Sequence, residues 1–338
     1  MADEPQDRPK PETINGLVAG VYPALAMLAG MQLELFTPLG DGAKSVDELA
    51  ATLEVGAARL RPLLYALVGA GLLDVQGDKF ANTPEADNFL VHGKRGYLGG
   101  QHEIHADLWQ STLLTAQSIR TGEPRAKHDF STMSKDDLGA FMRGLDSGAR
   151  AAARRLMKSY DFGRFRRLLD AGAGAGGLAA ELCGACPELA ATVADLPVVA
   201  EIAEHMIAER GLADRIAALG CDVVAAPPPG TYDVAVLRAF LQVLGPVAAA
   251  RVVANIAQKL EPGGEIFIIG RVLDDDRLGP SDAVAANVMF LNVYDEGQAY
   301  TEGEHRQWLQ SAGFREIERL RLGGGYSIIH GMQGQGAP

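Results

Sequence analysis

A glycine-rich turn in the middle of the chain is the clearest sign of chemistry in the sequence. Residues 170–177 read DAGAGAGG and lie between a short apolar run and an alanine-rich helical pattern. Glycine has no Cβ, so a ligand can lie directly against such a turn. Gly172, Gly174 and Gly177 fit the G-x-G-x-x-G pattern and Asp195 follows about 20 residues on, so a dinucleotide site has to be considered.

Three carboxylates favour a different ligand. Asp170 stands two residues before the first glycine, Asp195 follows a second apolar strand, and Asp222 follows a third. A carboxylate facing the turn repels a pyrophosphate and attracts a cation, whereas the other two are placed to bind ribose hydroxyls and an adenine amino group. The expected cofactor is S-adenosylmethionine (SAM), which is positively charged and has no phosphate.

The elements that hold these residues belong to an α/β pattern. From Arg166 onward, short apolar strands alternate with helices, which predicts a parallel sheet with crossover helices. The expected strands are 167–171, 191–195, 216–220, 232–238, 265–272, 314–321 and 326–330.

The amino-terminal part has a helical pattern instead. Ser45 and Glu48 have the spacing of a capping box that opens a helix over 46–53. A leucine-rich helix over 57–70 and two short strands at 71–75 and 79–83 complete a winged-helix pattern. We predict four segments, which are a disordered tail (1–14), a winged-helix dimerisation domain (15–96), a helical connector with the substrate pocket (97–160) and a SAM-binding domain (161–338).

Several motifs together resemble one family. They are DAGAGAG at 170–176, ADLPVV at 194–199, LGCD at 219–222, DVAVLRAFLQVL at 233–244, LEPGGEIFI at 260–268 and SAGF at 311–314. From about residue 15 to 331 the chain resembles the O-methyltransferase family of small-molecule methyltransferases. The resemblance implies a winged-helix dimerisation domain before a Rossmann-like SAM domain, and therefore a homodimer.

The same resemblance assigns site residues. It implies that the cofactor contacts Gly172, Gly174, Gly176, Asp195, Leu196, Asp222, Val223 and Arg238, in addition to Asp170. It also implies an acceptor-lining helix that carries Met289 and Asn292, and it places Arg143 where a helix approaches the acceptor.

The chain departs from the family at its catalytic base. The O-methylating members have a histidine and an aspartate directly after the stretch that matches Leu237 to Leu241, and here Gln242 and Val243 stand there. A glutamine amide takes no proton at neutral pH. We therefore assign no catalytic base, and we expect an acceptor that has no proton to lose, such as a thioether.

Other residues suggest acceptor contacts. His102, His105 and Trp109 share one face of an expected helix, although plain packing explains such a face equally well. Arg143 has the chemistry to clamp a carboxylate, and Tyr294 offers an aromatic face to a sulfonium. Two histidines without a nearby third ligand are a weak metal pattern, so no metal is expected.

These observations favour a small carboxylated acceptor, because aromatic residues make up only 6% of the chain. The chain also resembles the bacterial S-methyltransferases that make dimethylsulfoniopropionate, whose acceptor is 4-methylthio-2-hydroxybutyrate. S-methylation of that acid is the main hypothesis. One alternative is O-methylation of a phenolic or enolic secondary metabolite with His105 or a water as base, and another is a SAM-sensing winged-helix transcriptional regulator.

Charge and composition limit the partners. With 31 Lys and Arg against 43 Asp and Glu, the net charge of −12 repels nucleic acids and anionic membrane surfaces. The apolar run 17–33 contains Pro23 and reads as a buried helix, so no membrane contact is expected. The three cysteines form no disulfide framework, Cys183 and Cys186 read as packing residues, and the expected location is the cytoplasm.

Overall fold

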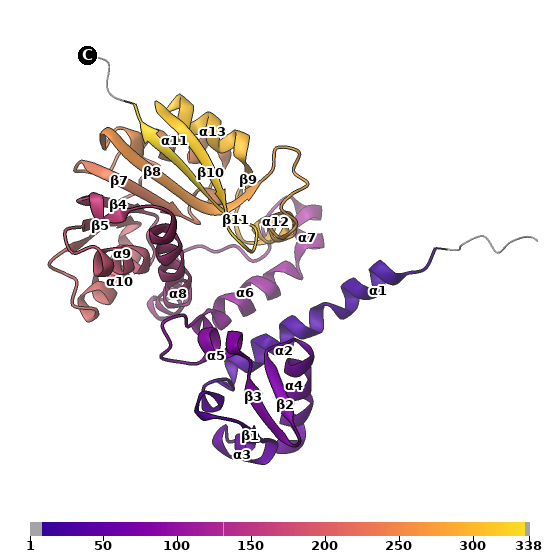
Figure 1. Cartoon of the computed structure of the whole chain (residues 1–338). Coiled ribbons are helices and arrows are strands. Elements are labelled where there is room, and N and C mark those ends of the chain that lie inside the picture. Colours follow the sequence, from indigo (N-terminus) through magenta and orange to yellow (C-terminus); the bar gives the residue numbers. More distant parts are fainter. Residues whose placement is uncertain (1–8, 131, 335–338) are drawn as a thin grey trace, which may run out of the picture. The chain divides into compact units, whose positions relative to one another are not determined.

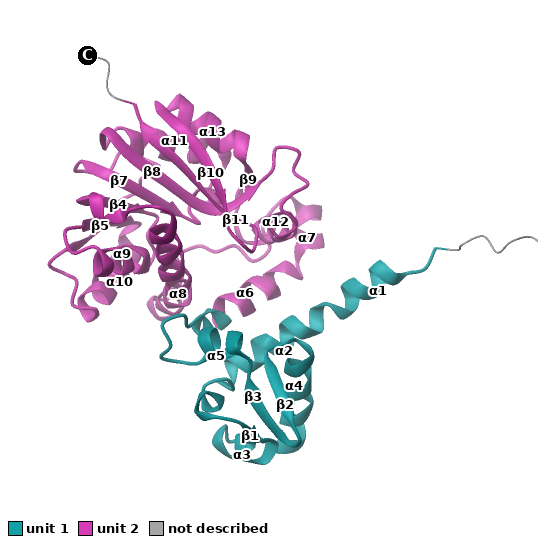
Figure 2. Ribbon diagram, viewed as in Figure 1, with its two compact units in different colours: residues 1–102 teal, residues 103–338 magenta. Residues whose placement is uncertain are grey.

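The computed structural model describes residues 9–130 and 132–334, and the chain divides into two compact units, residues 1–102 and 103–338 (Figure 2). The boundary differs from the four predicted segments. Most of the predicted connector belongs to the second unit, because Ala153 and Leu156 from that segment are buried in the same hydrophobic cluster as Leu168 and Leu178.

The first unit combines helices with a small antiparallel sheet of order β1-β3-β2. Its elements are α1 (Glu12–Ala19), α2 (Val21–Gln32), η1 (Pro38–Asp41), β1 (Lys44–Ser45), α3 (Val46–Thr52), α4 (Ala57–Gly69), β2 (Leu73–Gln76), β3 (Lys79–Asn82), α5 (Pro84–Leu90) and η2 (Gly99–Gln101). The capping box is confirmed, since Ser45 Oγ accepts from the Glu48 amide and the Glu48 carboxylate accepts from the Ser45 amide.

The apolar amino-terminal helices are buried only in part, since α2 buries Leu28, Gly30 and Met31. Helix α1 has no buried residue, and Leu17 and Tyr22 are about 73% and 68% exposed. Residues 12–32 form one helical stretch that is long and apolar enough to cross a membrane, by length and composition only. A long apolar stretch predicts a helix, but it does not tell whether that helix is buried. Hydropathy alone therefore did not distinguish the exposed helix α1 from a core helix.

The second unit contains one large sheet between two layers of helices (Figure 1). Its helices are α6 (His102–Thr112, which starts at the last residue of the first unit), α7 (Thr115–Thr121), α8 (Lys135–Ser159), η3 (Phe162–Arg164), α9 (Gly177–Ala185), α10 (Pro197–Glu209), η4 (Leu241–Val243), α11 (Pro246–Ala257), α12 (Ser281–Val293) and α13 (Glu302–Ser311). Its strands are β4 (Arg167–Ala171), β5 (Ala190–Asp195), β6 (Ile216–Gly220), β7 (Tyr232–Arg238), β8 (Leu260–Leu273), β9 (Tyr300–Thr301), β10 (Phe314–Arg321) and β11 (Tyr326–Gln333).

The sheet has the order β10-β11-β8-β7-β4-β5-β6, with β9 paired to β8. Strands β6, β5, β4, β7 and β8 are parallel, and β11 and β10 are antiparallel to their neighbours. The predicted α/β Rossmann-like fold is confirmed. Because the parallel strands are adjacent, the residues that follow them meet at one edge of the sheet.

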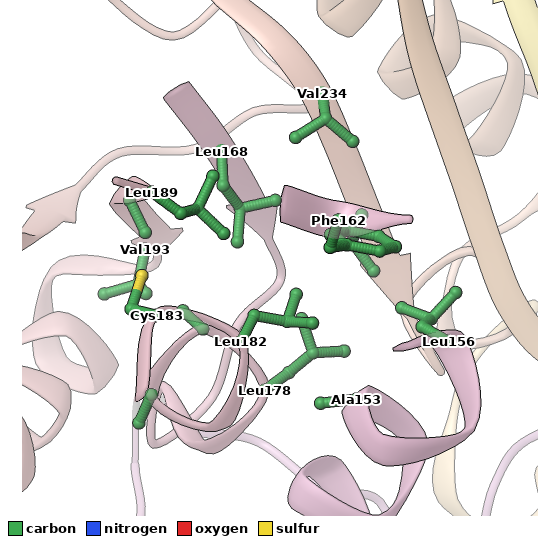
Figure 3. Packing of buried hydrophobic residues seen from close by; sticks show 14 of the residues in the cluster. Ala153, Leu156, Phe162, Leu168, Leu178, Leu182, Cys183, Leu189, Val193 and Val234 are labelled. Carbon is green, nitrogen blue, oxygen red and sulfur yellow. The ribbon is translucent and has the colours of Figure 1, made fainter. Parts of the chain in front are cut away.

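Apolar side chains alternate between the two faces of the sheet. Leu168 packs with Leu178, Leu182 and Cys183 on the side of α8 and α9 (Figure 3), and Leu169 packs with Val252 of α11 on the other side. The three cysteines are free, with Cys183 and Cys186 buried. Both faces of the central strands are therefore covered, which fixes the carboxyl edge of the sheet where the site lies.

Candidate cofactor and acceptor site

The loop between β4 and α9 has the backbone that a close ligand contact requires. Gly172, Gly174 and Gly176 have φ of 67°, 55° and 73°, in the left-handed region. A Cβ on Gly172 would overlap the ring of Phe240, and a Cβ on Gly174 would lie 3.5 Å from Met142 Sδ. Glycine is therefore needed for conformation at all three positions and for space at the first.

Asp170 is almost fully buried beside this loop. It is about 1% exposed, and its Oδ2 accepts a hydrogen bond of 3.3 Å from the Ala179 amide. Burial raises the pKa of Asp170 to about 7, although the Ala179 amide and Arg238 oppose the rise. A buried carboxylate of this kind gains from a cation placed next to it.

Asp195 joins the end of β5 to the glycine loop. Its Oδ2 accepts from the Gly174 amide and its Oδ1 from the Leu196 amide, both at 2.8 Å. Burial raises the pKa of Asp195, and these two amides oppose that rise. A carboxylate has about four acceptor positions, so two remain for a pair of hydroxyl donors.

Asp222 follows β6 and folds back on its own loop. Its Oδ1 accepts from the amides of Val224 at 2.9 Å and Ala225 at 3.3 Å. The buried amide of Asn255 on α11 donates to the Val223 carbonyl at 2.9 Å and fixes this loop from behind. Asn255 is a positioning residue that the motifs did not indicate.

Arg238 ends β7 on the same edge. Burial lowers its pKa, and the charges of Tyr326, Asp170 and Asp146 oppose this effect. The structure thus gathers the nine residues predicted to contact the cofactor at the ends of β4, β5, β6 and β7. Left-handed glycines and carboxylates with unused acceptor positions fit a cationic nucleoside such as SAM.

Gln242, in η4 after β7, has a structural bond. Its Oε1 accepts from the Arg271 amide at 3.0 Å. A Cβ on Gly270 would lie 2.9 Å from the same oxygen, so the glycine leaves room for this side chain. Gln242 therefore supplies a neutral amide fixed to β8, and it offers no group that accepts a proton.

An aromatic cluster of four side chains packs in part on the glycine loop. His128 is 5.1 Å from Phe141 and 5.9 Å from Tyr294 by ring centroids, and Phe130 is 5.4 Å from Phe141. Phe130 and Phe141 pack on the cluster that contains Ala175 of the glycine loop. Burial raises the pKa of Tyr294, and the charge of Asp107 adds to the effect.

The residues predicted to bind the acceptor differ in their surroundings. Met289 and Tyr294 pack on one cluster with Phe290. Arg143 is exposed, and its guanidinium lies over Gly139 of its own helix. Asn292 is fully buried, and both of its N–H groups are used by the Thr115 hydroxyl and the Val288 carbonyl.

The residues of the predicted face of α6 make local contacts. His105 stacks on Trp109 at 5.7 Å, and His102 bonds the Gly99 carbonyl through Nδ1 at 2.9 Å. The sequence analysis missed His128, Phe130 and Asp107 altogether. Within the described part of the chain, no three His, Cys, Asp or Glu side chains are grouped as metal ligands would be.

Comparison with known proteins identifies the class of the site. Residues 120–315 match the model of the O-methyltransferase domain. The chain is 30% identical to 3-hydroxy-5-methyl-1-naphthoate 3-O-methyltransferase of Streptomyces sahachiroi, over 96% of this chain and 95% of the relative. It is 29% identical to the tetracenomycin polyketide synthesis 8-O-methyl transferase TcmO of Streptomyces glaucescens, over 96% and 97%.

A solved structure has the same fold. Human N-acetylserotonin methyltransferase in complex with SAM has a TM-score of 0.82 at 24% identity, and covers 99% of this chain and 100% of its own. The family match extends over more than half of the chain, and it includes the glycine loop, the three carboxylates and Gln242. The chain therefore belongs to the O-methyltransferase family and is a SAM-dependent methyltransferase.

Proposed function

We propose that the enzyme methylates a hydroxyl group of an aromatic secondary metabolite. The aromatic cluster of His128, Phe130, Phe141 and Tyr294 carries this proposal, because it offers flat apolar surfaces and two of its members pack on the cluster that contains Ala175 of the cofactor loop. Ring stacking and edge-to-face contacts suit an aromatic acceptor. The names of the two Streptomyces relatives, a naphthoate and a polyketide O-methyltransferase, support the same class.

The thioether hypothesis loses two of its arguments. Besides the missing base at Gln242, it depended on a shortage of aromatic residues and on Arg143 as a carboxylate clamp. Two aromatic side chains, Phe130 and Phe141, pack on the cluster that contains Ala175 of the cofactor loop, and Arg143 is exposed on α8. The relatives' names support O-methylation rather than S-methylation.

The residues of the chain provide binding and orientation. SAM supplies a methyl group activated by a positively charged sulfur. Asp170 provides the buried negative charge, Asp195 the acceptors for the ribose, and Asp222 a carboxylate oxygen for the adenine. The glycine loop and the aromatic cluster hold donor and acceptor in one small space, and such alignment alone lowers a barrier by up to about 7–11 kcal/mol.

A panel of acceptors with methyl-labelled SAM tests the proposal. It contains 3-hydroxy-5-methyl-1-naphthoate and 4-methylthio-2-hydroxybutyrate, with Asp195→Ala as the inactive control. We expect label on the naphthoate hydroxyl and none on the thioether. Label found on the thioether alone would overturn the proposal and restore S-methylation.

We also propose that the enzyme is a cytoplasmic homodimer with α1 and α2 at its interface. The exposed apolar side chains of these helices include Leu17, Val21 and Leu25, which the described chain leaves uncovered. A second copy would remove this surface from water. Analytical ultracentrifugation should find a dimer for the wild type and the control Leu278→Glu, and a monomer for Leu17→Glu with Leu25→Glu. A monomeric wild type that sediments with lipid vesicles would contradict this.

A further inference from the structure

We propose that His128, oriented by Asp107, accepts the proton of the acceptor hydroxyl and so replaces the base that Gln242 cannot provide. This inference rests on the proposed O-methylation. The two residues lie 21 positions apart in the sequence, and neither belongs to the motifs that define the cofactor site.

The two nitrogens of the His128 ring differ in their surroundings. Nε2 lies 2.7 Å from Asp107 Oδ2, so Nε2 carries a proton that it donates to the carboxylate. Nδ1 then keeps a lone pair. It is buried and has no hydrogen-bond partner in the described structure, in a side chain that is only 5% exposed.

A buried acceptor without a partner costs free energy unless a ligand satisfies it. An imidazole with one nitrogen fixed by a carboxylate and the other left as an acceptor has the arrangement of a general base. Nδ1 of His128 thus lacks a hydrogen-bond donor, and the hydroxyl group of the methyl acceptor would provide one.

The position of His128 is fixed by contacts on several sides. Its amide donates to the Val293 carbonyl at 3.0 Å, and the Ala126 amide donates to the Asn292 carbonyl at 2.9 Å. These bonds hold the segment against the end of α12. The ring is then enclosed by Phe130, Phe141 and Tyr294.

The aromatic cluster connects His128 to both sides of the methyl-transfer site. On one side Phe130 and Phe141 pack with Ala175 of the glycine loop. On the other side, Gly297 lies close to both Tyr294 and Gln242. A Cβ added to this glycine would be 2.8 Å from Tyr294 Cβ and 3.0 Å from the Gln242 carbonyl oxygen. His128 is therefore linked through Tyr294 and Gly297 to the backbone of Gln242, the position of the missing base.

The proton transfer balances within the proposed reaction. The hydroxyl proton moves to Nδ1 of His128, the oxygen forms the new bond to the methyl carbon, and the electron pair of the broken carbon–sulfur bond stays on sulfur. The imidazolium that results is paired with Asp107, which is 47% exposed and can pass the proton to water.

Nitrogen NMR of the full chain with ¹⁵N-labelled histidine tests the arrangement without turnover. His128→Gln identifies the signals, and the exposed pair of His205 with Glu209 serves as the matched control. We expect the proton of His128 on Nε2. Asp107→Asn replaces the carboxylate by a weaker acceptor that can also donate, so the share of His128 with its proton on Nδ1 should rise, whereas Glu209→Gln should leave His128 unchanged.

Kinetics tests the catalytic role on the acceptor that the wild type methylates. Removal of a general base costs about 10²- to 10⁴-fold in rate. We expect losses in this range for His128→Gln and Asp107→Asn, with the affinity for SAM unchanged by calorimetry. The loss should shrink for more acidic phenols, since these ionise without help, and a purely structural role would not produce that trend.

The outcomes separate the two proposals. If the wild type methylates none of the hydroxyl acceptors, the proposed function fails, and the NMR spectra still decide the state of His128. A proton on Nδ1 in the wild type would overturn the role of His128 by itself. A wild-type rate in His128→Gln on a confirmed hydroxyl acceptor would do the same.

Discussion

Asp170→Asn is the substitution for which the structure makes the most quantitative prediction. The carboxyl is about 1% exposed and has a pKa of about 7 in place of 3.8. A raised pKa in the folded state means that the folded chain holds this proton more tightly than the unfolded chain. The stability of the ligand-free wild type should therefore fall as the pH rises from about 4 to about 7.

The size of this effect follows from the two pKa values. They differ by about 3, and each unit corresponds to about 1.4 kcal/mol, so keeping Asp170 ionised costs the ligand-free protein about 4 kcal/mol at most. Between pH 5 and pH 8 the cost should grow by roughly 2–3 kcal/mol. Asparagine carries no charge, so the free energy of unfolding of the variant Asp170→Asn lacks this contribution.

Urea unfolding at pH 5 and pH 8 measures the difference. The free energy of unfolding of Asp170→Asn minus that of the wild type should rise by roughly 2–3 kcal/mol between the two pH values. A constant offset from the changed hydrogen bond with Ala179 cancels in this comparison. The exposed Asp214 gives the control Asp214→Asn, which makes the same chemical change at the surface.

Binding of SAM should change in the opposite direction. A cationic ligand gains from the buried charge, so calorimetry should find weaker binding for Asp170→Asn at pH 8. Wild-type affinity should increase with pH up to about 7, because below that value Asp170 must first lose a proton. If the stability difference were the same at pH 5 and pH 8, the assignment of Asp170 as a buried ionisable ligand would be refuted.

Three further substitutions test the loops and caps. Gly172→Ala should be destabilised by about 1–3 kcal/mol and should lose SAM binding, because φ is 67° and the Phe240 ring occupies the place of the new Cβ. Urea unfolding measures the first effect and calorimetry the second. Asn255→Ala should weaken SAM binding by up to about tenfold by releasing the Val223 carbonyl, with the exposed Gln258→Ala as control. Ser45→Ala should cost about 1 kcal/mol by urea unfolding without changing SAM affinity.

Local sequence patterns predicted the sheet well. The expected strands at 167–171, 216–220 and 232–238 have the bounds of β4, β6 and β7, since each is a short apolar run between clear breaks. The sequence analysis missed the start of β8 at Leu260, where the pairing with β7 shifts register near the glycines of the loop. Two-residue strands such as β9 have too few residues to show a period.

The acceptor side was not predictable in the same way. His128 and Asp107 come together because backbone bonds hold 126–128 against 292–293, and no periodic spacing marks such a contact. The cofactor residues, in contrast, follow consecutive parallel strands, so their order in the sequence already placed them at one edge. Arg143 was misplaced because residues that follow each other on a helix point in different directions, and its neighbour Met142 is the one that faces the glycine loop.

The neutral amide of Gln242 at the position of the base has two explanations: the acceptor needs no base, or another residue supplies it. The sequence alone does not decide between them. If proton removal were unnecessary, nothing would maintain a buried imidazole with an unused acceptor beside the site, because the unsatisfied nitrogen only costs stability. His128 retains that nitrogen and is oriented by Asp107. The structure is more consistent with a base supplied by His128 than with an acceptor that needs none.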